Sequence, residues 1–209
     1  MENFNFLYTP PSGTSLLLMD KIFDEHFLIN ELVKAGFDAE KLFTSALQAR
    51  KCEQLSWRYA LLKLLEKNKI PFCDLAKDEN GAPFLVSKSG FISVSHTNTQ
   101  VAVAFNPNVA LGIDSQPINS KIENLQHKFL NEYEIELSQN NIDTLTKAWT
   151  IKEAVYKLVN QKGLALKDIE IQRFIDHNFT SILVNNIKIN TYSIIENNTF
   201  LSVAFFSED

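Results

Sequence analysis

A short stretch near residue 150 places an acid, a base and an aromatic residue at helical spacing. Glu153 and Lys157 stand four residues apart, and Trp149 precedes Glu153 by four, so all three would share one helix face. An ammonium group held beside a reacting phosphate can stabilise the charge that develops there, which is one use of such a lysine. The commoner explanation of a Glu–Lys pair is an exposed ion pair that stabilises a helix. The pair alone therefore does not identify a site.

A second set of polar groups ends an apolar strand near residue 114. Asp114 follows Leu111, Gly112 and Ile113, and Gln116 would point to the same side if the strand continues. A carboxylate in this place could also simply cap the following turn. Carboxylate and amide oxygens are hard ligands that suit Mg²⁺ bound jointly by a protein and by substrate phosphates.

Two long helices are predicted on either side of these groups. The first covers about residues 43–67, where leucines form an apolar stripe with charged residues between them. The second runs from about Asp143 to Gln161 and would carry the acid–base motif. Asp143 or Thr144 could cap its start, and Gly163 is placed to end it.

Three short strands are predicted between the helices, at about residues 91–95, 101–105 and 109–113, and their short connections favour an antiparallel meander. The first and third strands of a meander run in the same direction. His96 and Asp114 would therefore emerge at one sheet edge, about 10 Å apart. A loop histidine at a hairpin is the default alternative for His96.

Two further patterns predict turns. The sequence Asp78-Glu79-Asn80-Gly81 is a strong turn signal. Near the C-terminus, strands at about 187–195 and 199–206 flank Glu196-Asn197-Asn198, whose asparagines tolerate the positive φ that hairpin turns need.

Three motifs together resemble a known family. SVSH (Ser93–His96), GID (Gly112–Asp114) and WTIKEAVYK (Trp149–Lys157) occur in the order and spacing of the 4′-phosphopantetheinyl transferases. The chain resembles the larger, single-chain (Sfp-type) class of that superfamily, which serves fatty-acid, polyketide and nonribosomal-peptide carrier proteins. The resemblance covers about residues 50–165. Three motifs in order with matching intervals are fairly specific.

The resemblance implies an activity and its partners. The activity is transfer of the 4′-phosphopantetheine arm of coenzyme A to a serine of an apo acyl-carrier or peptidyl-carrier protein, with release of 3′,5′-ADP. Mg²⁺ is the implied cofactor, coenzyme A is the substrate, and a monomer is expected. No covalent enzyme intermediate is required, because the carrier brings the attacking serine.

The resemblance also implies roles for individual residues. Asp114 and Glu153 match the magnesium carboxylates, with Gln116 at a third metal position. Glu153 would also help to deprotonate the carrier serine, directly or through a water. Lys157 matches the lysine that contacts the coenzyme A phosphates and assists the departing nucleotide. The other positions at the coenzyme A phosphates match Ser95 and His96, and Arg58 matches an arginine near the 3′-phosphate.

Two residues depart from the family pattern. Gln116 stands where the family usually has glutamate, which predicts a weaker metal site, and Ala82 stands where a Gly-Lys-Pro segment usually has lysine. One cation near the nucleotide is therefore missing, unless another lysine substitutes for it. These departures leave an alternative open: a degenerate family member that binds coenzyme A or a carrier protein without catalysis. A structural protein with a coincidental match is the remote third reading.

Composition sets the broad class. The 209 residues are 45% hydrophobic and 22% charged, as in soluble globular proteins, and the net charge of −5 with no basic cluster argues against nucleic-acid binding. No run of about 20 apolar residues predicts a membrane span, and the two cysteines have no metal-site spacing, which fits a reducing cytoplasm. The expected fold is α+β, with two similar halves at residues 1–108 and 109–209 and an active site in the crevice between them. The second half would carry the metal motif.

Overall fold

The computed structural model of the protein describes residues 4–11, 13–38, 48–72, 74–174 and 178–207. Contacts between elements divide the chain into a first unit, Met1–Asn108, and a second unit, Val109–Asp209. Each unit contains helices and antiparallel sheet, so the fold is α+β, as predicted. Among the described helices, none has the length and apolar character needed to cross a membrane.

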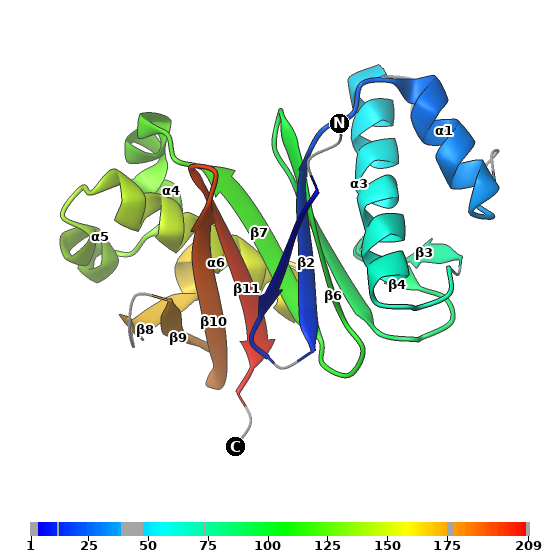
Figure 1. Cartoon of the computed structure of the whole chain (residues 1–209). Helices are drawn as coiled ribbons and strands as arrows, with labels where there is room; N and C mark the ends of the chain where they lie inside the picture. Colours follow the sequence, from blue (N-terminus) through cyan, green and yellow to red (C-terminus); the bar gives the residue numbers. More distant parts are fainter. Residues whose placement is uncertain (1–3, 12, 39–47, 73, 175–177, 208–209) are drawn as a thin grey trace. The chain divides into compact units, whose positions relative to one another are not determined.

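The first unit packs a long helix on a four-stranded antiparallel sheet of order β1-β2-β6-β5 (Figure 1). The helix α3 contacts β6 and β2, and α1 packs against α3. Buried leucines along α3, among them Leu55, Leu61 and Leu65, fill the space between helix and sheet. The elements are β1 (Asn5–Thr9), β2 (Thr14–Asp20), α1 (Glu25–Lys34), α3 (Gln48–Lys67), β5 (Phe91–His96) and β6 (Gln100–Asn106).

A small hairpin of β3 (Leu75–Lys77) and β4 (Pro83–Leu85) also belongs to the first unit. Its turn is the Asp78–Gly81 signal. The Asp78 side chain accepts hydrogen bonds from the backbone N–H groups of Asn80 and Ala82, both at 2.9 Å. Gly81 has φ +86°, a conformation that favours glycine. The predicted turn is confirmed.

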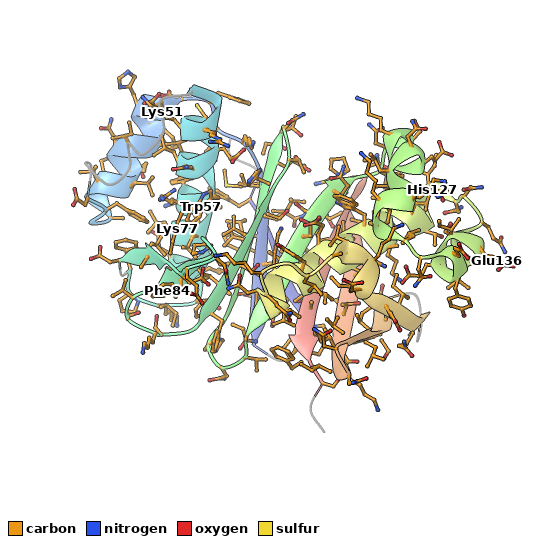
Figure 2. All side chains as sticks on the ribbon, turned by 180° about the vertical axis from the view of Figure 1, so that it is seen from behind. Lys51, Trp57, Lys77, Phe84, His127 and Glu136 are labelled. Carbon is orange, nitrogen blue, oxygen red and sulfur yellow. The ribbon has the colours of Figure 1, made fainter. Side chains whose placement is uncertain are left out.

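The second unit packs α6 on a five-stranded antiparallel sheet of order β7-β11-β10-β9-β8. Figure 2 shows this unit from behind, where α6 crosses in front of the sheet. The helix contacts β7 and β11 most extensively. The elements are β7 (Leu111–Pro117), η1 (Ser120–Leu125), α4 (Gln126–Phe129), α5 (Glu132–Ser138), α6 (Ile142–Val159), η2 (Leu166–Asp168), β8 (Glu170–Phe174), β9 (Phe179–Val184), β10 (Ile187–Glu196) and β11 (Thr199–Phe206).

The predicted C-terminal hairpin is confirmed. Strands β10 and β11 pair from Ile189↔Phe206 to Glu196↔Thr199, and the two turn residues Asn197 and Asn198 have φ of 48° and 58°. Strands β6 (QVAVAFN) and β11 (TFLSVAFF) have similar sequences. Both are internal strands, and each lies against the long helix of its unit. A pseudo-twofold relation between the units stays a prediction.

Both predicted long helices exist, but the predicted caps of the second were wrong. Helix α6 begins one residue earlier than expected, because the Asn141 side chain accepts the Thr144 N–H at 2.9 Å. It ends at Val159, and the C-cap residue Asn160 adopts the left-handed conformation with φ 51°. Asn141 and Asn160 are therefore the capping residues of this helix, in place of the predicted ones. For the first helix, residues 43–47 lie outside the described residues.

The predicted three-stranded meander was also wrong. β5 and β6 form the expected hairpin, but β7 pairs with β11 in the sheet of the second unit, from Leu111↔Phe205 to Pro117↔Thr199. The short connection after β6 resembles a hairpin loop, but it joins two sheets. His96 and Asp114 therefore belong to different sheets, and the reason for expecting them at one sheet edge is removed.

Candidate active site

The residues of the candidate site lie where β7 and α6 pack closely against each other. Gly112, Asp114 and Gln116 alternate along β7 and share one face of the strand. A Cβ atom at Gly112 would lie 2.0 Å from the Ala154 carbonyl oxygen and 2.7 Å from the Leu158 nitrogen, both backbone atoms of α6. Only glycine fits here, and its missing side chain lets the helix backbone rest directly on the strand.

This approach brings Lys157 onto Asp114. The Lys157 ammonium donates hydrogen bonds to Asp114 Oδ1 at 2.8 Å and to the Ile113 carbonyl oxygen at 2.9 Å. The Asp114 side chain is 10% exposed and that of Lys157 is 28% exposed. The spacing of Glu153 and Lys157 could also have meant an exposed ion pair within one helix. Lys157 does not fit that explanation, because its ion-pair partner, Asp114, is on a strand.

Glu153 lies one helical turn before Lys157 and is half-buried. Burial raises the pKa of Glu153, the negative charge of Asp114 raises it further, and Lys157 partly offsets both effects. Two carboxylates and one lysine are thus electrostatically coupled at this place. A carboxylate with a raised pKa is a better proton acceptor than an ordinary glutamate.

The raised pKa of Glu153 predicts how stability depends on pH. A carboxyl group whose pKa is higher in the folded state favours folding below its ordinary pKa, and this contribution is lost as the pH rises through the raised value. At pH 7 the ionised Glu153 therefore opposes folding. We expect Glu153→Gln to raise the melting temperature at pH 7, with a gain that shrinks as the pH falls below the ordinary pKa. Thermal unfolding of both proteins from pH 4 to pH 8 measures this; a gain that does not depend on pH would contradict it.

The residue next to Glu153 forms a network that the sequence did not reveal. The Lys152 ammonium, whose side chain is 0% exposed, contacts Glu134 Oε2 at 2.6 Å and the Leu166 carbonyl oxygen at 3.2 Å. Glu134 also accepts the backbone N–H groups of Asn131 at 3.0 Å and Ile171 at 2.8 Å. This ion pair fixes α6 against α5, η2 and β8. In the sequence, only its place inside the motif Trp149–Lys157 drew attention to Lys152.

Hydroxyl groups and an aromatic pair fix other parts of α6. Thr150 Oγ1 lies 2.7 Å from Ser202 Oγ, and Ser202 is the β11 partner of Asp114. The Trp149 ring packs edge-on against Phe129 with centroids 5.0 Å apart, so Trp149 supports the core of the second unit. These contacts set the rotation of the helix that carries Glu153.

In the first unit, His96 ends β5 and is half exposed, while Ser95 beside it is buried. His96 Nε2 lies 3.1 Å from Glu53 Oε1, and Lys21 Nζ lies 3.3 Å from the second oxygen of the same carboxylate. Glu53 and Lys21 were not among the predicted site residues. Their only sequence signal is their charge.

Arg58 is a partly buried cation on α3. Its Nη1 donates to the Gln54 carbonyl oxygen at 3.0 Å, and its guanidinium carbon lies 4.4 Å from the Trp57 ring centroid. Figure 2 labels Trp57 on this helix. Burial lowers the pKa of Arg58 to about 10, so the group stays charged at neutral pH. Within the described residues Arg58 has no carboxylate partner. Its guanidinium group could therefore bind an anionic ligand.

The predicted metal residues fit a divalent cation in their chemistry. Burial raises the pKa of Glu153 and the negative charge of Asp114 raises it further, so a cation between the two carboxylates would relieve the cost of ionising Glu153. Gln116 adds an amide oxygen on the same strand face as Asp114. In the part of the chain that the structure describes, no group of three or more His, Cys, Asp or Glu side chains could hold a metal. Mg²⁺ would thus need ligands from the amide, from water or from a substrate phosphate.

The structure brings together only part of the predicted site. Asp114, Glu153 and Lys157 form one constellation in the second unit, with Gln116 on the same strand. Arg58, Ser95 and His96 all belong to the first unit. That both sets serve one ligand stays a prediction.

A family model supports the predicted identity. Residues 110–204 match the 4′-phosphopantetheinyl transferase superfamily, and this span contains β7, α6 and the Asp114–Glu153–Lys157 constellation. Most of the second unit is therefore similar to the 4′-phosphopantetheinyl transferase superfamily, in agreement with the motifs.

Solved structures show a weaker likeness. The holo-[acyl-carrier-protein] synthase of Thermotoga maritima is 15% identical with a TM-score of 0.41, over 48% of this chain and 64% of that one. The holo-[acyl-carrier-protein] synthase of Helicobacter pylori, solved in complex with coenzyme A, is 22% identical with a TM-score of 0.40, over 46% of this chain and 99% of that one. This chain thus spans less than two thirds of the length of the first of these relatives. No curated protein matches the chain.

Proposed function

We propose that this chain is a magnesium-dependent phosphopantetheinyl transferase of the larger single-chain class. It would transfer 4′-phosphopantetheine from coenzyme A to a serine of an apo acyl-carrier or peptidyl-carrier protein, as a monomer in the cytoplasm. The observation that carries the proposal is the coupled Asp114–Glu153–Lys157 constellation within the residues that match the superfamily.

The proposed chemistry uses these residues in distinct roles. The carrier serine oxygen attacks the β-phosphorus of coenzyme A, and the bond from that phosphorus to the departing 3′,5′-ADP breaks. Glu153 takes the serine proton, directly or through a water, and its raised pKa suits that role. Lys157 would face the growing negative charge of the departing phosphate, because its ammonium group is already held against the middle of β7 by Ile113 and Asp114.

Asp114, Glu153 and Gln116 would hold Mg²⁺. When bound, the metal supplies charge neutralisation at the diphosphate. Arg58, Ser95 and His96 would bind the remaining phosphate groups of coenzyme A. Arg58 is suited to the 3′-phosphate, since it is charged and has no acidic partner among the described residues.

The decisive measurement is the intact mass of candidate apo carrier proteins after incubation with this protein, coenzyme A and Mg²⁺. We expect a gain of one phosphopantetheine group. Glu153→Gln should lower the rate about 10²- to 10⁴-fold, the usual cost of losing a general base. Glu136→Gln is the matched control, because Glu136 is an exposed glutamate on α5 (Figure 2) and should leave the rate unchanged.

The other outcome also decides between functions. If no carrier gains mass but coenzyme A still binds, the chain is a degenerate member that binds without transfer, as Gln116 and Ala82 suggest. If coenzyme A does not bind at all, the proposed function is wrong.

A further inference from the structure

Three side chains from separate segments of the first unit are joined in a row by short polar contacts. Lys21 directly follows β2, Glu53 is on α3, and His96 ends β5. We propose that Lys21 and Glu53 are positioning residues, which hold the His96 imidazole in the orientation that meets an anionic group of the ligand. The inference rests on the function proposed above, in which that ligand is coenzyme A.

The carboxylate of Glu53 joins the other two groups. Its Oε2 faces Lys21 Nζ at 3.3 Å, and its Oε1 faces His96 Nε2 at 3.1 Å. A carboxylate at this distance favours a hydrogen on Nε2 and fixes the plane of the ring. The other ring nitrogen, Nδ1, would then face the anionic group, and it donates to that group when the ring carries both hydrogens. The carboxylate cannot turn without breaking its contact with Lys21 or with His96.

The backbone around Lys21 is fixed on two sides. Its N–H donates to the Thr99 carbonyl oxygen at 2.7 Å, in the loop that follows His96. The next residue, Ile22, exchanges two hydrogen bonds with the Ser56 side chain of α3, at 3.2 and 3.1 Å. Lys21 is therefore attached both to the loop beside His96 and to the helix that carries Glu53.

Exposure increases along the three side chains. Lys21 is 7% exposed, Glu53 is 24% exposed and His96 is 47% exposed. The ammonium at the buried end cannot readily meet a ligand, whereas the imidazole at the open end can. Because Lys21 is buried and contacts Glu53, it would act on a ligand through the carboxylate and the ring.

The test compares Lys21→Met with Lys21→Arg and Glu53→Gln. The readouts are the ring nitrogen chemical shifts of His96 by NMR, assigned with His96→Gln, and the affinity for coenzyme A by calorimetry. We expect Lys21→Met and Glu53→Gln to shift the His96 signals and to weaken coenzyme A binding about tenfold, the value of one charge-assisted hydrogen bond. Lys21→Arg keeps the cation and should restore both readouts.

Lys51→Met is the matched control. Lys51 is also a lysine of the first unit, paired with Glu25 at 3.9 Å, and Figure 2 labels it on α3. Removing it should leave the His96 signals and the coenzyme A affinity unchanged.

The outcomes separate this inference from the proposed function. If coenzyme A binds but Lys21→Met changes neither the His96 signals nor the affinity, the Lys21–Glu53 pair has only a structural role and the inference is overturned. If the unmodified protein does not bind coenzyme A, the proposed function fails. The His96 signals of Lys21→Met and Glu53→Gln then still decide whether these residues position the ring.

Discussion

Lys152→Met should destabilise the protein by about 3–5 kcal/mol, the cost of leaving one partner of a buried ion pair without its opposite charge. The Glu134 carboxylate would stay in a site where it is 2% exposed, and among the described residues the backbone N–H groups of Asn131 and Ile171 would remain to stabilise it. Burial lowers the pKa of Lys152 and the contact with Glu134 raises it again, so each charge depends on the other. The midpoint of urea unfolding measures the loss.

Two further variants control this result. Lys152→Met combined with Glu134→Gln should recover much of the lost stability, because the unpaired charge is gone and an amide oxygen still accepts one N–H. Lys167→Met, which removes an exposed lysine from η2, should change stability by less than about 0.5 kcal/mol. A loss of less than about 1 kcal/mol in Lys152→Met would mean that Glu134 is satisfied without the lysine.

Gly112→Ala is expected to disturb both stability and the candidate site. The added methyl group would meet the Ala154 carbonyl oxygen at 2.0 Å, and neither backbone can give way without moving the helix. Overpacking of this kind costs about 1–3 kcal/mol or more. Because Lys157 reaches Asp114 only across this contact, the phosphopantetheine transfer rate should fall even at temperatures where the variant stays folded.

The double variant Gly112→Ala, Ala154→Gly tests whether the clash with the α6 backbone causes the loss. The obstacle is the carbonyl oxygen and not the methyl group of Ala154, so the second change should not restore the transfer rate. Unfolding midpoints and mass-based transfer assays on both variants check the prediction. Unimpaired transfer by folded Gly112→Ala would show that the helix can move away from β7 without consequence for the chemistry.

Several features could be predicted from the sequence because neighbouring residues determine them. The helical repeat places Glu153 and Lys157 on one face, and α6 forms where that repeat predicts it. Asp78–Gly81 and Asn197–Asn198 form turns because their side chains and backbone freedom suit turns wherever they occur. The order of three short motifs was sufficient to predict the superfamily that the match over residues 110–204 supports.

The tertiary structure alone decided which partners these residues meet. β7 pairs with β11, which lies far along the chain at Thr199–Phe206, although the short connection of β7 to β6 favoured a meander. The same packing, through Gly112, directs Lys157 to Asp114, and distant segments join Lys152 to Glu134 and Lys21 to Glu53. Local periodicity specifies which face of an element a residue occupies, but the free energy of packing between distant segments decides what that face contacts.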